Sequence, residues 1–129
     1  MTGGIIITHG PMARALIKAA ETILGKTTLL HGFSSTDMTM KEISEKAGKI
    51  IESDDWPEDT LILVSLKGGS CWRAALTIRS EQQNVAVVAG INLSMLLSFI
   101  TKRANHTLDE LASLAKEDGI RGIDRYEEE

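Results

Sequence analysis

Several protein classes are excluded by what the sequence contains little of. Cys71 is the one cysteine among 129 residues, so neither a disulfide framework nor a cysteine-based metal site is expected. Lysine and arginine (14) are outnumbered by aspartate and glutamate (18), and the net charge of -4 argues against nucleic acid as a partner. The longest apolar stretch, residues 95–100, is far too short to cross a bilayer.

Targeting, linker and repeat segments are lacking as well. Met1 leads directly into the first predicted strand, which argues against a signal peptide. Hydrophobic residues make up 43% of the chain and charged residues 25%, the balance of a soluble globular protein. We therefore expect residues 1–129 to form one cytoplasmic domain with a buried core.

Apolar runs alternate with helical patterns along the chain. Short β-branched and aliphatic runs predict strands at residues 5–7, 27–33, 60–64 and 85–89. Apolar residues at helical spacing predict helices at residues 12–24, 40–51, 71–79, 94–103 and from 108 to about 119. This order predicts an α/β fold, with a single open, mostly parallel sheet of about four strands and helices on both faces.

Three signals predict where helices begin and end. Thr39 with Glu42, and Thr107 with Glu110, have the spacing of capping boxes. Gly119 is expected to end or kink the last helix.

His9 stands between the first strand and the first helix. Gly10 and Pro11 follow it directly and stop the strand. The carboxyl end of such a strand is where open α/β sheets bind ligands, and a helix start favours an anion there. Neutral imidazole is available near pH 7 as a nucleophile or base, so His9 is the candidate catalytic residue. The alternative is a structural histidine that only hydrogen-bonds within the fold.

Three turns are expected on the same edge of the sheet, because each follows a predicted parallel strand. They are Thr8–Gly10, Lys67–Ser70 and Gly90–Asn92. Gly68 and Gly69 let the backbone approach a ligand, and the helix amides that follow, with the Ser70 hydroxyl, could hold phosphate oxygens.

Other polar residues near these turns have two interpretations each. Lys67 and Arg73 would add positive charge near an anion, or they are solvated surface groups. Asn92 is either a turn former that tolerates positive φ or a ligand donor. No pair of carboxylates and no metal-ligand spacing occurs near His9, so metal chemistry and glycosidase-type catalysis are not expected.

Four blocks of the sequence resemble a known family and together cover essentially the whole chain. They are residues 4–10, 13–25, 68–70 and 90–96. The chain is similar to the IIA component of the mannose class, also called the fructose subfamily, of the bacterial phosphoenolpyruvate-dependent sugar phosphotransferase system (EIIA, type 4).

The resemblance implies a phosphoryl carrier. His9 would accept a phosphoryl group from the phosphohistidine of the carrier HPr and pass it to a IIB domain during sugar uptake, with no further cofactor. Thr8, Gly10, the glycine turn and Asn92 would support the phosphate. The resemblance also implies a homodimer that exchanges a C-terminal segment, and contact with the membrane only through permease components.

The chain departs from the family pattern after the third strand. Ser65 stands where the family usually has aspartate, and Lys67 where it has tryptophan or a similar residue. Cys71 replaces a common proline, and Arg73 a typical asparagine. A serine can orient the histidine ring but supplies no negative charge, which predicts altered rate and lifetime of the phosphohistidine.

Two alternatives differ in class from a transport component. One is a regulatory module with the same fold that binds proteins according to its phosphorylation state and carries little transport flux. The other is a histidine phosphatase or mutase, which typically places arginine directly before its histidine; here Thr8 precedes His9.

Overall fold

The computed structural model describes residues 1–128, and within them the chain forms four strands and five helices. The strands are β1 (Gly3–Thr8), β2 (Leu30–Ser34), β3 (Thr60–Val64) and β4 (Val85–Ala89). The helices are α1 (Met12–Leu24), α2 (Met40–Ile51), α3 (Ser70–Glu81), α4 (Leu93–Lys102) and α5 (Leu108–Arg121).

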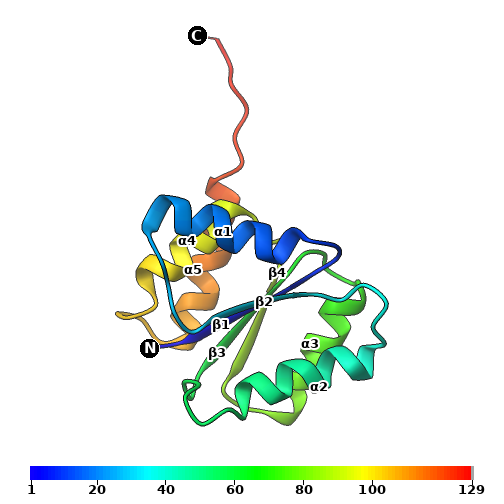
Figure 1. Ribbon diagram of the computed structural model, residues 1–129. Helices are drawn as coiled ribbons and strands as arrows, with labels where there is room; N and C mark the ends of the chain where they lie inside the picture. Colours follow the sequence, from blue (N-terminus) through cyan, green and yellow to red (C-terminus); the bar gives the residue numbers. More distant parts are fainter. Residues whose placement is uncertain (129) are drawn as a thin grey trace.

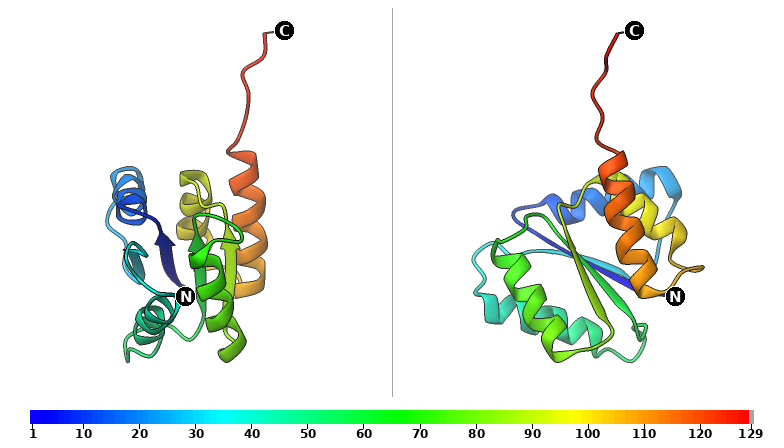
Figure 2. Two further views of the ribbon diagram at one scale, coloured as in Figure 1. Left: turned by 90° about the vertical axis from the view of Figure 1, so that its right-hand side faces the viewer. Right: turned by 180° about the vertical axis from the view of Figure 1, so that it is seen from behind.

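The four strands form one open sheet in the order β2-β1-β3-β4, and every pair is parallel. The predicted α/β class is therefore confirmed. Helices cover both faces of the sheet (Figure 1; Figure 2). Every residue of the central strands β1 and β3 is buried, which explains why both strands are apolar almost throughout.

Side chains of β1 alternate between two cores, as the pleat of a strand requires. Ile5 and Ile7 pack with buried residues of α2 and α3 on one face of the sheet. Ile6 packs with buried residues of α1, α4 and α5 on the other face. The three isoleucines thus anchor the strand that carries His9 from both sides.

Several predicted bounds differ from the observed ones by one to three residues, and two of these differences have a clear physical cause. Strand β2 begins at Leu30 and not at residue 27, because Leu29 adopts a left-handed φ of 56° that an extended strand does not allow. Gly119 neither ends nor kinks α5, which runs on to Arg121. Gly119 is buried, and a Cβ placed on it would come within 2.8 Å of Cε of Met95, so this glycine permits close packing against α4.

The predicted capping boxes at the starts of α2 and α5 are confirmed. Thr39 accepts a hydrogen bond from the Glu42 amide, and the Glu42 carboxylate accepts one from the Thr39 amide. The latter bond lowers the pKa of Glu42. Thr107 and Glu110 form the same pair at the start of α5.

Strand β4 forms one edge of the sheet, with β3 on its inner side. Beyond α5, residues 123–128 extend away from the body of the molecule (Figure 1; Figure 2). Within the described residues, no helix is long and apolar enough to span a membrane.

Candidate functional site

The carboxyl end of the sheet brings His9 next to the turn that follows β3. Nδ1 of His9 lies 3.3 Å from Oγ of Ser65. A Cβ atom placed on Gly69 would lie 4.0 Å from Cε1 of His9, so the ring stands in ordinary contact distance of the glycine turn. The His9 side chain is exposed. The structure therefore joins two of the three predicted turns around an accessible imidazole.

The hydrogen bond to Ser65 involves only one of the two ring nitrogens of His9, Nδ1. The Ser65 hydroxyl can donate or accept, so it is compatible with either imidazole tautomer. Nε2 is the nitrogen that remains available for chemistry. Among residues 1–128, no carboxylate forms an ion pair with His9.

The start of α3 presents unpaired backbone donors beside this ring. Gly68 has a φ of +83°, a left-handed conformation that favours glycine. Gly69 occupies the N-cap position and offers no side-chain cap. In the described part of the chain, the amides of Ser70, Cys71 and Trp72 have no hydrogen-bond acceptor. Unpaired amides and the helix dipole together make a helix start attractive to an anion.

Thr8 and Gly10 shape the turn around His9 with groups that are already bonded. Oγ1 of Thr8 is buried and accepts a hydrogen bond from the Ala13 amide at 2.8 Å. Gly10 has a φ of +59°, and its amide donates to Oγ1 of Thr36 at 3.1 Å. Both residues support the site by holding its backbone.

Asn92 links two helices. Its side-chain oxygen caps α4 by accepting the Met95 amide, and its side-chain nitrogen donates to the Gly119 carbonyl. The turn-former interpretation with positive φ is wrong, because Asn92 has a φ of -137° and Gly90 carries the positive φ of that turn. Both ends of the Asn92 amide are engaged within the chain.

Lys67 and Arg73 are exposed near the same turn. Neither forms an ion pair with a carboxylate in residues 1–128. Lys67 lines a hollow of about 630 Å³ that also contains Ser65, Trp72 and Lys116 and runs along β4. This hollow adjoins the His9 site through Ser65.

The loop after β2 contributes contacts that sequence reasoning missed. Ser35 hydrogen-bonds the carbonyl of Thr8, Thr36 bonds the amide of Gly10, and Cys71 donates from its thiol to Ser35. The available signal was a run of hydroxyl side chains at the carboxyl end of a strand. Such runs also serve as helix caps, so the sequence alone does not distinguish the two uses.

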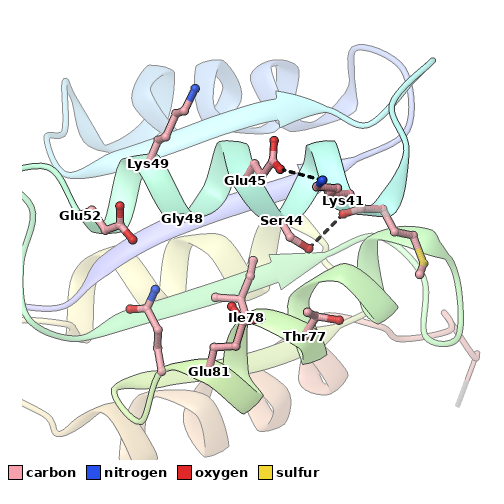
Figure 3. A pocket seen from close by; sticks show the side chains of 11 residues that line it. Lys41, Ser44, Glu45, Gly48, Lys49, Glu52, Thr77, Ile78 and Glu81 are labelled. Carbon is pink, nitrogen blue, oxygen red and sulfur yellow. Dashed lines mark hydrogen bonds and ion pairs between the residues drawn. The ribbon is translucent and has the colours of Figure 1, made fainter.

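A second large hollow, of about 640 Å³, lies between α2 and α3 (Figure 3). Polar residues outnumber apolar ones in its lining, which includes the Lys41–Glu45 ion pair and Gly48. Neither His9 nor the glycine turn lines it. Within the described residues, no group of three or more histidine, cysteine, aspartate or glutamate side chains could hold a metal ion.

The fold and the site together define a class: open, parallel α/β proteins with an exposed histidine and an uncapped helix start at the ligand-binding edge of the sheet. The family model described as PTS system fructose IIA component matches residues 3–116, so the chain belongs to that family of sugar phosphotransferase-system components. The resemblance found in the sequence is thereby confirmed.

Individual relatives agree with this assignment. The chain is 33% identical over 126 residues to the mannose-specific EIIAB component of Escherichia coli (strain K12), covering 95% of this chain and 39% of that protein. It therefore spans about two fifths of that relative's length. It is 26% identical over 117 residues to the fructose-specific EIIA component of Bacillus subtilis (strain 168), covering 90% of this chain and 80% of that protein. The crystal structure of phosphotransferase system component EIIA from Streptococcus agalactiae has the same fold, with a TM-score of 0.89, 22% identity and 97% of each chain covered.

Proposed function

We propose that this protein is a phosphoryl carrier that accepts a phosphoryl group on His9 from phospho-HPr and passes it to a IIB component. The observation that carries the proposal is the arrangement around His9. An exposed imidazole is held by Ser65 next to a helix start whose first amides have no acceptor in residues 1–128. That arrangement suits a nucleophile that becomes a dianionic phosphohistidine.

The transfer requires neutral His9 with its proton on Nδ1. Nδ1–H then donates to Oγ of Ser65, and the lone pair of Nε2 attacks the phosphorus of the donor. As the new N–P bond forms, the N–P bond of the donor phosphohistidine breaks and its electron pair returns to the donor ring. Amides of α3 and the Ser70 hydroxyl would hydrogen-bond the phosphate oxygens, each such bond to a charged group contributing about 1.5–3 kcal/mol.

Residues 1–129 would act as one cytoplasmic EIIA domain that reaches the membrane only through permease components. Pairing of two copies is part of the proposal. Strand β4 is an edge strand, and an unpaired strand edge is a template for another strand. The hollow along β4 and the extended residues 123–128, which include exposed Ile123 and Tyr126, support exchange of that segment between copies.

A regulatory role is the second candidate, and Ser65 favours it. A carboxylate at that position would stabilise positive charge on the His9 ring, whereas the serine hydroxyl at 3.3 Å only orients it. Slower transfer suits a protein that reports the phosphorylation state to a binding partner. Capture of phosphorylated and unphosphorylated protein from the native cell, followed by identification of bound permease or regulatory components, distinguishes the two roles.

The carrier proposal is tested by incubation with phosphoenolpyruvate, enzyme I and HPr, followed by mass spectrometry. We expect a gain of one phosphoryl group that is labile to acid and stable to alkali. His9→Ala should abolish this gain, while His31→Ala and His106→Ala, which replace the other two histidines, should keep it. Phosphorylation that survives in His9→Ala would contradict the proposal, as would no phosphorylation of the natural protein.

A further inference from the structure

The peptide group before His9 is held by Ser35, which lies just beyond β2. The carbonyl of Thr8 accepts two hydrogen bonds from this residue, one from the Ser35 amide at 2.8 Å and one from its Oγ at 3.3 Å. Ser35 is 5% exposed, so these bonds are shielded from water. The amide plane that joins Thr8 to His9 is therefore fixed by the residue that follows the neighbouring strand.

The peptide group after His9 is held by Thr36. The amide of Gly10 donates to Oγ1 of Thr36 at 3.1 Å, and Oγ of Ser34 donates to the same atom at 2.8 Å. The Thr36 amide donates back to Oγ of Ser34 at 3.1 Å, which holds the threonine side chain in place. Consecutive residues of one loop thus bind the peptide groups on both sides of the histidine.

Fixing both peptide planes fixes φ and ψ of His9 and, with them, the direction of its Cα–Cβ bond. Within residues 1–128 the exposed ring makes one hydrogen bond, the 3.3 Å contact to Ser65, so its position depends largely on the backbone that carries it. We infer that Ser35 and Thr36 are positioning residues for the phosphoryl-transfer histidine, an inference that rests on the proposed function.

The same loop also connects His9 to the start of α3. The thiol of Cys71 donates to Oγ of Ser35 at 3.2 Å, and both residues are buried. Cys71 lies in the first turn of α3, among the amides that have no acceptor in the described chain. Ser35 therefore bonds both to the peptide that carries the nucleophile and to the helix turn that would receive the phosphate. Placement of the reacting atom matters because a displacement of about 1 Å costs roughly 100-fold in rate.

Thr36 offers the sharper test because it is exposed and its replacement leaves the core intact. Thr36→Val removes the acceptor of the Gly10 amide and keeps the side-chain shape, whereas Thr36→Ser keeps the hydroxyl. Thr22→Val is the matched control, since it removes an exposed hydroxyl that bonds the Lys18 carbonyl in the last turn of α1, at the far end of that helix from His9. Transfer from phospho-HPr and the ring ¹⁵N shifts of His9 are measured for all four proteins.

We expect Thr36→Val to lower kcat about tenfold with KM within about twofold, because the ring is misplaced and not the partner surface. Its Nδ1 and Nε2 shifts should move toward those of histidine in an unstructured peptide. Thr36→Ser and Thr22→Val should match the natural protein. The inference is overturned if Thr36→Val leaves both readouts unchanged, or if Thr36→Ser is impaired as much as Thr36→Val.

Failure of the proposed function gives a different result. If the natural protein accepts no phosphoryl group from phospho-HPr, the carrier proposal is wrong. The ring shifts are measured without any partner, and phosphoramidate serves as a small phosphoryl donor for the rate comparison. The positioning role of Thr36 is therefore decided in either case.

Discussion

Two helix starts in this molecule are built in opposite ways. At the start of α5, Thr107 and Glu110 satisfy each other's amides, as Thr39 and Glu42 do at the start of α2. At the start of α3, Gly69 supplies no cap, and the first amides have no acceptor within residues 1–128. Glycine in place of a capping side chain lowers the stability of a helix by about a few tenths of a kcal/mol. The uncapped helix lies next to His9, in keeping with the proposal that its amides bind a phosphate.

The start of α1 is intermediate between these two cases. It has no cap from the residue before it, but Oγ1 of Thr8, from the end of β1, accepts the Ala13 amide. Of the two helices that begin beside His9, α1 is thus partly satisfied and α3 is open. We expect α3 to provide most of the phosphate contacts.

Gly69→Asp should break the contrast between the helix starts and give the largest effect. Gly69 has a φ of -79° and an extended ψ, the conformation of an ordinary N-cap, so aspartate fits there without strain. Its carboxylate would accept the α3 amides and repel a phosphate. We expect His9 phosphorylation to fall by about 100-fold or more while the free energy of unfolding rises by about 0.3 kcal/mol.

Radiolabelled phosphoryl transfer and urea unfolding measure these two quantities. Gly69→Ala is the control, because it adds a Cβ at the same position but no cap and no charge. Faster or unchanged phosphorylation in Gly69→Asp would show that the α3 amides do not bind the phosphate.

Ser65→Asp should sharpen the comparison by strengthening the hydrogen bond to Nδ1 of His9 while the α3 amides stay unchanged. A carboxylate in hydrogen-bond reach of Nδ1 fixes the tautomer and stabilises positive charge on the imidazole. We expect phosphorylation by phospho-HPr to become about tenfold faster. The change is measured by following phosphorylation over time in the natural protein, Ser65→Asp and the uncharged Ser65→Asn. Equal rates for all three would remove the argument that Ser65 slows the carrier.

Thr107→Ala tests the closed helix start and should have the smallest effect on function. Losing the cap leaves the Glu110 amide without its acceptor and should lower the free energy of unfolding by about 1 kcal/mol. Phosphorylation of His9 should be unchanged, because α5 begins at the opposite end of the sheet. Urea unfolding and the transfer assay check both expectations. A loss of phosphorylation would mean that capping and function are not separate.

Sequence reasoning found most of the fold because local rules determine it. The apolar runs of β3 and β4 and the capping boxes depend on residues close together in the chain, and their predicted bounds agree with the structure. The start of β2 was missed because the left-handed conformation of Leu29 has no signal in a run of β-branched and aliphatic residues. Gly119 was misread because its reason, the contact with Met95, lies on another helix.

The contacts of the site likewise include some that could be predicted from the sequence and some that could not. The neighbourhood of His9, Ser65 and Gly69 followed from the rule that parallel strands end on one edge. The hydrogen bonds of Ser35 and Thr36 to the flanks of His9 could not be predicted. They depend on the register of β2 against β1, in which Ser34 lies opposite Thr8.

Strand β1 lies inside the sheet, bonded to β2 on one side and β3 on the other, and its isoleucines are packed from both faces. His9, the proposed nucleophile, is therefore attached to a strand that is held on all sides. Arrival of a phosphoryl group should change the local charge by about two units without moving the main chain. A partner that distinguishes the phosphorylated from the unphosphorylated protein would then have to recognise the charge itself, since the backbone conformation would be the same in both.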